Sequence, residues 1–167
     1  IVHRLDKDTS GILLVAKNDA FRNYFINEMQ ERRVVKKYIA VVSGETLGSF
    51  EINDAIGRDK SNRTKMSIRQ DGKEALTYVK LKEKIGNYSI LDISIETGRT
   101  HQIRVHLASK KLPIIGDKTY DPRRTIIKDS SQKIIDIVRS FPRQALHARY
   151  LGFKCPETDE EISFETP

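Results

Sequence analysis

The 167-residue chain has no tryptophan, two methionines, five prolines and a single cysteine, Cys155. One cysteine excludes an internal disulfide framework and a zinc site built from several cysteines, and it suits a reducing compartment such as the cytoplasm. No apolar run approaches the roughly 20 residues that a membrane-spanning helix needs, so no membrane partner is expected. A secretory signal peptide is also missing, although Ile1 is not a start methionine and the natural N terminus is expected to lie upstream.

Cofactor and metal patterns are missing as well. Gly98 is too isolated for a phosphate loop, and neither GxxxxGK[ST] nor GxGxxG occurs. His101 and His106 are five residues apart, which places them on opposite faces of a strand or about 140° apart on a helix. His3 and His147 could meet only through tertiary contacts. We therefore expect no metal and no cofactor, and we interpret His106 and His147 as hydrogen-bonded packing residues.

Basic residues outnumber acidic ones. Lys and Arg total 30 against 23 for Asp and Glu, which gives a net charge of +7 and a pI near 9.5. Such a balance favours a polyanionic partner, nucleic acid first, although solubility alone could account for it. The hydrophobic share of 38% and the charged share of 32% fit a soluble protein. We expect residues 1–167 to form a single domain with one core.

Periodicity predicts both strands and helices. Apolar, β-branched or alternating residues predict strands at 12–16, 35–42, 75–81, 88–95, 146–153 and 162–164. Gly86-Asn87 is the expected hairpin turn. Helical spacing predicts helices over 19–32, from His101 to the Lys111-Leu112-Pro113 stretch, and around Ile134, Ile135 and Val138.

Helix caps and buried faces can also be assigned. Asn18 is predicted to cap the first helix, Thr100 the second, and Ser130 or Ser131 the third. Ile103 and Leu107, four residues apart, are expected to face the core. The aromatic and methionine side chains of the first helix are interpreted as core residues: Phe21, Tyr24, Phe25 and Met29.

Three stretches carry the candidate chemistry. The first is His3-Arg4-Leu5-Asp6-Lys7-Asp8-Thr9-Ser10-Gly11, a charged loop placed before an apolar run. Loops at strand ends are where rigid scaffolds usually display reactive groups. The second is Lys36-Lys37-Tyr38-Ile39-Ala40-Val41-Val42-Ser43-Gly44, and the third runs from Thr97-Gly98-Arg99 through His101-Gln102-Ile103-Arg104 to His106-Leu107.

Together with Leu146-His147-Ala148, Phe153 and Pro156, these stretches resemble the RNA pseudouridine synthases of the large-subunit ribosomal RNA (Rlu) type. The resemblance runs from residue 1 to about residue 165. It implies an α+β fold in which a mixed, mainly antiparallel sheet bends around a basic catalytic cleft, with flanking helices. It also implies strands before His3, so the chain is expected to be a catalytic domain that lacks its N-terminal strands.

The resemblance assigns roles to individual residues. It implies that Asp6 is catalytic and that Tyr38 stacks against the target base, although Tyr38 could also be a simple packing residue. The motif order implies that Arg104 faces Asp6 and holds its carboxylate through charge-assisted hydrogen bonds. An ionised carboxylate beside a sugar can act as a nucleophile or stabilise positive charge.

Several mechanisms stay open. Asp6 can attack C1′ of the ribose, attack the base, or help remove a ribose proton to give a glycal. Tyr38 is a candidate base for a later proton transfer. Arg4 is expected to contact RNA or to fill the space left by a flipped nucleotide. None of these steps needs a cofactor.

The most basic segment is 57–73, which carries Arg58, Lys60, Arg63, Lys65, Arg69 and Lys73. We interpret it as a mobile loop or hairpin with phosphate contacts, against the alternative of an ordinary solvated hairpin. The predicted RNA-binding residues are Arg4, Arg58, Arg63, Lys65, Arg99 and His101.

The favoured hypothesis is a monomeric enzyme that converts uridines in structured ribosomal or transfer RNA to pseudouridine. The first alternative is a non-catalytic RNA-binding module on the same fold. Binding alone needs no trio of Asp6, Tyr38 and Arg104, which argues against it. A basic structural protein without an RNA role is the third hypothesis, and only the charge balance supports it.

Overall fold

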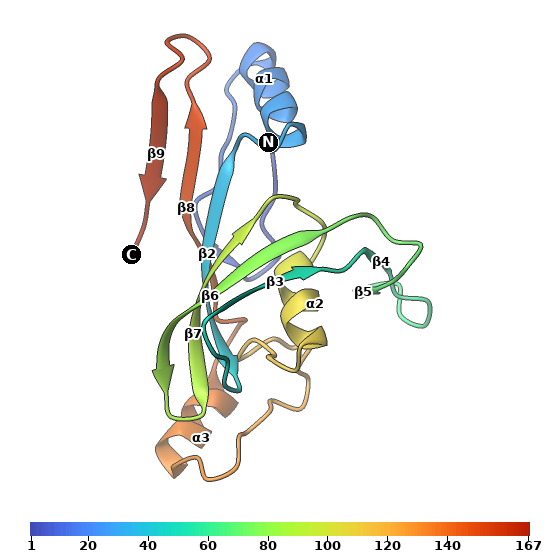
Figure 1. Cartoon of the computed structure of the whole chain (residues 1–167), viewed down its shortest axis with the longest axis vertical. Helices are drawn as coiled ribbons and strands as arrows, with labels where there is room; N and C mark the ends of the chain where they lie inside the picture. Colours follow the sequence, from blue (N-terminus) through green and yellow to red (C-terminus); the bar gives the residue numbers. More distant parts are fainter.

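A computed structural model describes residues 1–167, and a seven-stranded sheet is at its centre (Figure 1). The strand order is β1-β8-β2-β7-β6-β3. The seventh strand, β9, pairs with the second half of β8, on the edge opposite β2. The strands are β1 (Ser10–Gly11), β2 (Val35–Ser43), β3 (Ser49–Asn53), β6 (Leu76–Ile85), β7 (Tyr88–Ile95), β8 (Leu146–Lys154) and β9 (Glu161–Glu165). Only the β1–β8 pair is parallel, so the predicted mixed, mainly antiparallel sheet is confirmed.

Three helices and a small hairpin complete the α+β fold. The helices are α1 (Asp19–Gln30), α2 (Gln102–Ser109) and α3 (Gln132–Ser140). Asn18 accepts a hydrogen bond from the Phe21 amide and Ser131 accepts one from the Ile134 amide, so these two predicted caps are confirmed. The hairpin consists of β4 (Ile56–Arg58) and β5 (Met66–Ile68), and it projects beside α2 (Figure 1). None of these three helices could span a lipid bilayer.

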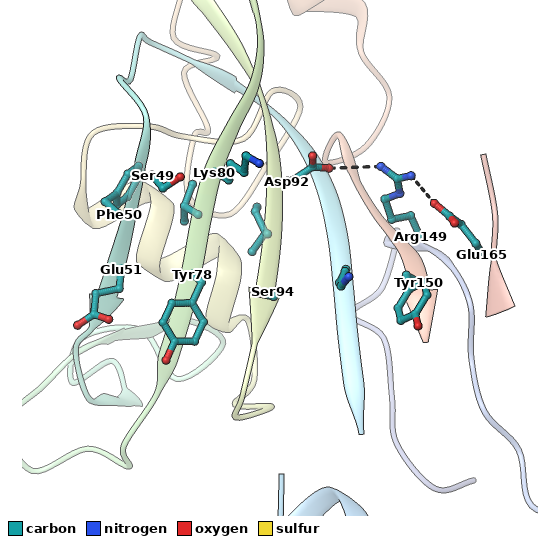
Figure 2. A pocket seen from close by; sticks show the side chains of 13 residues that line it. Ser49, Phe50, Glu51, Tyr78, Lys80, Asp92, Ser94, Arg149, Tyr150 and Glu165 are labelled. Carbon is teal, nitrogen blue, oxygen red and sulfur yellow. Dashed lines mark hydrogen bonds and ion pairs between the residues drawn. The ribbon is translucent and has the colours of Figure 1, made fainter. Parts of the chain in front are cut away.

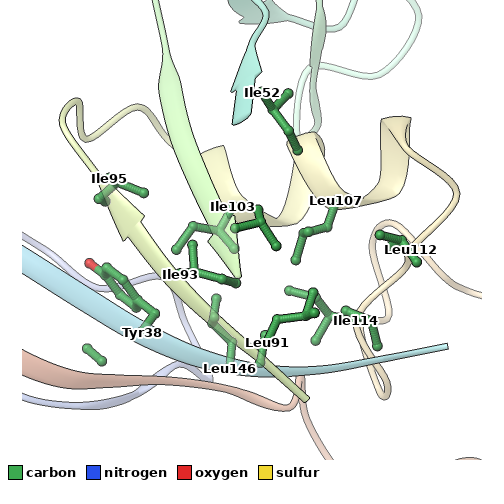
Figure 3. Packing of buried hydrophobic residues seen from close by; sticks show 14 residues of the cluster. Tyr38, Ile52, Leu91, Ile93, Ile95, Ile103, Leu107, Leu112, Ile114 and Leu146 are labelled. Carbon is green, nitrogen blue, oxygen red and sulfur yellow. The ribbon is translucent and has the colours of Figure 1, made fainter. Parts of the chain in front are cut away.

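The core lies between the sheet and α2. Ile103 and Leu107 point from α2 onto Leu91 and Ile93 of β7, as Figure 3 shows, and all four are almost fully buried. Burial of an Ile or Leu side chain stabilises a fold by about 1.5–3 kcal/mol. This packing fixes α2 on the sheet, and α2 in turn carries Arg104.

The two faces of the sheet differ, as the alternation in β2 predicts. Lys36, Tyr38, Ala40 and Val42 are all buried on the face toward α2, whereas Lys37 is exposed on the other face. The predicted β6–β7 hairpin is also confirmed, with Gly86 in its turn at φ 57°. Positive φ at this turn suits a residue without a Cβ.

The second face of the sheet contains a hollow of about 660 Å³ (Figure 2). Its side chains are mostly polar and are partly engaged with each other. Arg149 lies between Asp92, at 3.3 Å, and Glu165, and the Lys37 ammonium lies 4.8 Å from the centre of the Tyr150 ring. None of the predicted site residues lines this hollow.

The prediction of a buried strand at 12–16 is wrong. The ladder between β1 and β8 ends at Gly11, and the Ile12 amide makes one last bond to Ala148 O. The Leu14 amide then bonds to His3 Nε2 instead of to a neighbouring strand. Leu13 and Val15 are 44% and 56% exposed, so an apolar composition alone did not ensure burial here.

Two details of the helices also differ from expectation. Thr100 does not cap α2; the N-cap is His101, which has φ 56° and makes no side-chain cap, and the helix begins at Gln102. In α1 only Phe25 among the four predicted core residues is fully buried, where it packs edge-on against Phe153 at 4.8 Å. The other three are half-buried because α1 lies at the end of the sheet (Figure 1).

Candidate functional site

The loop that carries Asp6 is held by hydrogen bonds from the segment that precedes β8. The Gln144 side-chain amide donates to Lys7 O at 2.7 Å and to Thr9 Oγ1 at 3.0 Å. Within the loop, the Thr9 amide donates to Asp6 O at 3.0 Å. A short loop with bonds on both sides holds its side chains in few orientations, so the Asp6 carboxylate is positioned before any ligand arrives.

Arg104 pairs with Asp6 as predicted, with Nη1 3.3 Å from Asp6 Oδ2. The bidentate partner of Arg104 is a different residue, Asp117. Nε donates to Asp117 Oδ2 at 2.7 Å, and Nη2 donates to Asp117 Oδ1 at 2.8 Å. The side chains of Arg104 and Asp117 are only 6% and 1% exposed. One guanidinium therefore bridges two carboxylates, and it holds Asp117 more tightly than Asp6.

Asp117 was not assigned a role from the sequence. Its Oδ1 also accepts hydrogen bonds from the Thr119 and Tyr120 amides. Burial alone would raise the pKa of Asp117, but the hydrogen bonds and the charge of Arg104 outweigh burial, so its pKa is lowered. The only sequence signal was an acid directly after the apolar Ile114-Ile115-Gly116 stretch, a position where an unpaired carboxylate would be costly.

Tyr38 lies at the border between the core and the Asp6 loop. It is 8% exposed, belongs to the core cluster, and its hydroxyl makes no hydrogen bond within the chain. Burial raises the pKa of Tyr38 to about 12, and the nearby Asp6 charge adds to the effect. The phenol is therefore neutral at physiological pH, which suits a stacking surface better than a phenolate base.

The loop before α2 is organised by Gln102. Its Oε1 accepts from Thr97 Oγ1 at 2.8 Å and from the Arg99 amide at 3.0 Å. Its Nε2 donates to Leu76 O and to Thr77 Oγ1, both at 3.0 Å. This buried amide thus satisfies all its hydrogen-bonding groups and fixes the backbone that presents Arg99 to the cleft.

Tyr120 connects this loop with the β4–β5 hairpin. Its hydroxyl is 2.8 Å from His101 Nδ1, and it accepts a hydrogen bond from the Met66 amide at 2.9 Å. The Tyr120 ring also lies 5.1 Å from Arg104 Cζ, within cation–π range. His101 is half-buried, and burial lowers its pKa against the opposing charge of Asp6. No sequence pattern pointed to Tyr120.

Two adjoining hollows open at this site. One, of about 90 Å³, is lined by Asp6, Tyr38 and His101, and the other measures about 450 Å³. Both hollows share the residues Arg4, Tyr38, Ile95, Gly98 and Arg99. The small recess, which holds one carboxylate, thus adjoins a larger groove.

The structure brings together only part of the predicted RNA-binding set. Arg4 and Arg99 line both hollows, and His101 lines the smaller one. Arg58, Arg63 and Lys65 belong to the hairpin and line neither. The segment 57–73 does form the predicted hairpin, in which Arg58 Nη1 donates to Arg63 O at 2.6 Å.

The histidines outside the site are packing residues, as expected. His106 Nδ1 is 2.9 Å from Thr77 Oγ1 and its Nε2 is 2.9 Å from Asp54 O. His147 Nδ1 is 2.8 Å from Ser10 Oγ. No three His, Cys, Asp or Glu side chains gather as a set of metal ligands anywhere in the chain.

Comparison with known proteins identifies relatives of this arrangement. Residues 1–109 match the family described as RNA pseudouridylate synthase. Over its whole length the chain is 41% identical to the "Ribosomal large subunit pseudouridine synthase D" of Vibrio cholerae and 44% identical to the "Uncharacterized RNA pseudouridine synthase YlyB" of Bacillus subtilis. It covers 52% and 51% of these two proteins, so it spans about half the length of the curated relatives it matches.

A solved structure agrees with the sequence matches. The "Human RNA Pseudouridylate Synthase Domain Containing 1" superposes with a TM-score of 0.80 at 31% identity. The alignment covers 99% of this chain and 67% of the human one. The chain therefore shares its fold with this human protein.

Proposed function

The chain belongs to the RNA pseudouridylate synthase family, and on that premise we propose that its cleft isomerises uridine in RNA to pseudouridine. The observation that carries the proposal is the Asp6 carboxylate, held 3.3 Å from Arg104 in a hollow that Tyr38 also lines. We further propose that residues 1–167 act as a single, monomeric catalytic domain in the cytoplasm.

The proposed reaction breaks the glycosidic bond between N1 and C1′ and forms a bond between C5 and C1′. C5 loses its proton and N1 gains one, so substrate and product are isomers. Positive charge develops at the sugar carbon as the N–C bond breaks, and a carboxylate at this position can stabilise it or attack it. Attack at C1′, attack at the base and a glycal route all place Asp6 close to the glycosidic bond.

A uridine within folded RNA must leave its stack to reach Asp6, at a cost of a few kcal/mol. The Tyr38 ring supplies a stacking surface at the entrance, and Arg4 is exposed and its side chain makes no hydrogen bond or ion pair within the chain. We propose that Arg4 contacts RNA there or occupies the space that the flipped nucleotide leaves. Arg99 and His101 complete the rim of the recess.

We propose structured RNA of the large ribosomal subunit as the substrate, with transfer RNA as the alternative. The name of the Vibrio cholerae relative supports the ribosomal choice. The positive net charge of +7 supports a polyanionic substrate of either kind. Mapping pseudouridines in ribosomal and transfer RNA of cells with and without the gene separates these two possibilities.

The enzyme assignment is tested with Asp6→Asn in the complete protein. We expect pseudouridine formation to be abolished and RNA affinity to stay nearly unchanged, because phosphate contacts supply most affinity and Asp6 makes none. Tritium release from C5-labelled uridine measures the first, and a filter-binding titration measures the second. Turnover by Asp6→Asn at the rate of the unaltered protein would refute the mechanism, and no turnover by the unaltered protein would favour the non-catalytic RNA-binding module.

A further inference from the structure

Lys36 is a mostly buried lysine that has no role in the reaction proposed for Asp6. It lies on β2 two residues before Tyr38, on the same face, and only 8% of its surface is exposed. The lysines that form ion pairs in this protein are Lys84, Lys110 and Lys154, and Lys36 is not among them. It also makes no side-chain hydrogen bond within the chain.

An unpaired ammonium in this position is costly. The Lys36 side chain is mostly buried, and its ammonium, which is not fully buried, has no counter-ion within the chain, so it has lost part of its water without gaining a partner. Burial accordingly lowers the pKa of Lys36, and no carboxylate opposes that effect. Since no side chain of the protein neutralises Lys36, the natural counter-ion is a ligand.

The space around Lys36 is suited to an anion. Lys36 lines the 450 Å³ hollow together with Arg4, Arg99 and His3. The single carboxylate of this hollow, Glu96, is already engaged, with Arg32 at 3.2 Å and the Tyr78 hydroxyl at 2.9 Å. An excess of positive charge is therefore left facing the groove.

We propose that Lys36 binds a backbone phosphate of the RNA, next to the nucleotide whose base stacks on Tyr38. This inference rests on the proposed function, because it takes Tyr38 as the base-stacking residue. Two residues along a strand span roughly 6.6 Å, so Lys36 and Tyr38 can hold adjacent parts of one bound strand. The proposed ligand is a phosphodiester of the RNA backbone. By binding it, Lys36 would position the RNA strand for Asp6.

The test compares Lys36→Met with Lys37→Met in the complete protein. Methionine keeps much of the length of lysine without its charge, and Lys37 is the neighbouring lysine, exposed on the opposite face. The ligand is a seven-nucleotide single-stranded RNA with a central uridine, titrated by fluorescence anisotropy at several salt concentrations. We expect Lys36→Met to flatten the plot of log affinity against log salt by about 0.7, the value for one lost phosphate contact, and Lys37→Met to leave it unchanged.

Neutral methylphosphonate links, placed one at a time along the same RNA, locate the phosphate. The unaltered protein should lose affinity when a link beside the central uridine is neutral, and Lys36→Met should be insensitive to that substitution. Lys36→Arg should keep the salt slope. A Lys36→Met protein with the slope and the methylphosphonate pattern of the unaltered protein would overturn the proposal.

Thermal unfolding separates binding from folding. Because Lys36 is mostly buried and its charge has no partner, Lys36→Met should melt at the same temperature as the unaltered protein or higher. A clear drop in melting temperature would instead assign the ammonium a structural role and overturn the inference.

The two proposals fail in different ways. If the unaltered protein forms pseudouridine and Lys36→Met binds RNA normally, only the phosphate site is refuted. If RNA binding depends on Lys36 and no pseudouridine forms, only the enzymatic function is refuted.

Discussion

Asp117→Asn is the substitution that best tests how the candidate site is held together. It keeps the shape of the side chain and an oxygen for the Thr119 and Tyr120 amides, but it removes the charge that Arg104 grips at 2.7 and 2.8 Å. Breaking a buried ion pair from one side typically costs about 3–5 kcal/mol, because the other charge stays buried. Asp6 still contacts Arg104, so we expect the lower end, about 3 kcal/mol.

The matched control is Asp54→Asn. Asp54 pairs with Lys110 at 3.1 Å, but these side chains are 36% and 44% exposed, and such a pair contributes at most about 1 kcal/mol. Urea titration by circular dichroism measures both variants. For a domain of this size 1 kcal/mol shifts the melting temperature by roughly 2–4 °C, so Asp117→Asn should melt about 6–12 °C lower. A loss no greater than that of Asp54→Asn would refute the central role of the Arg104–Asp117 pair.

The effect of Asp117→Asn on stability should also depend on pH. The pKa of Asp117 is lowered in the folded state, so its contribution to stability is present above the unfolded-state pKa and is lost as pH falls through the folded-state pKa. The stability difference between the unaltered protein and Asp117→Asn should therefore be largest near neutral pH and shrink in acid. A difference that stays constant down to pH 2 would contradict this account.

Two further predictions concern the hairpin and Tyr38. Replacing Arg58, Arg63 and Lys65 together by Gln should leave the fold intact. The slope of log RNA affinity against log salt, measured by anisotropy titration, should flatten by roughly one per lost phosphate contact. An unchanged slope would make the segment an ordinary solvated hairpin. Because burial raises the pKa of Tyr38 from 10.0 to about 12, the stability that its neutral phenol supplies is present below pH 10 and is lost between pH 10 and 12. Ultraviolet difference titration of the unaltered protein against Tyr38→Phe should show a phenol with a midpoint near 12, and a midpoint near 10 would show that Tyr38 is not buried in solution.

The parts of the fold that the sequence predicted are those in which local pattern and burial agree. In β2 the period-two alternation placed Tyr38 and Ala40 on one face, and the packing of α2 against that face confirms it. The β6–β7 hairpin followed from Gly86-Asn87, whose turn geometry is a local property. The contact between Asp6 and Arg104, 98 residues apart, was predicted only from the order of the motifs together with the family resemblance.

The failures have a common cause, which is that neighbours distant in sequence decided the outcome. The 12–16 segment has the composition of a buried strand, but β8 pairs with it only as far as Ile12, so it continues without a strand partner. His101 takes the left-handed N-cap position because Gln102, rather than Thr100, organises the loop through bonds to Leu76 and Thr97. Asp117 follows an apolar stretch and accepts from two nearby amides, but no sequence pattern pointed to its ion-pair partner Arg104, which lies on α2.

The division of contacts around Arg104 bears on how Asp6 could react. If Asp6 held the bidentate pair, its charge would be largely neutralised and its oxygens occupied. Instead Asp117 takes the two short hydrogen bonds and offsets the guanidinium charge, and Asp6 keeps one longer contact at 3.3 Å with 17% of its side chain exposed. The cluster of one cation and two carboxylates therefore carries a net negative charge, which faces the recess through Asp6. Under the proposed function, this is the charge that would meet a ribose carbon as its glycosidic bond breaks, so Asp117 would support catalysis by leaving Asp6 oriented but still reactive.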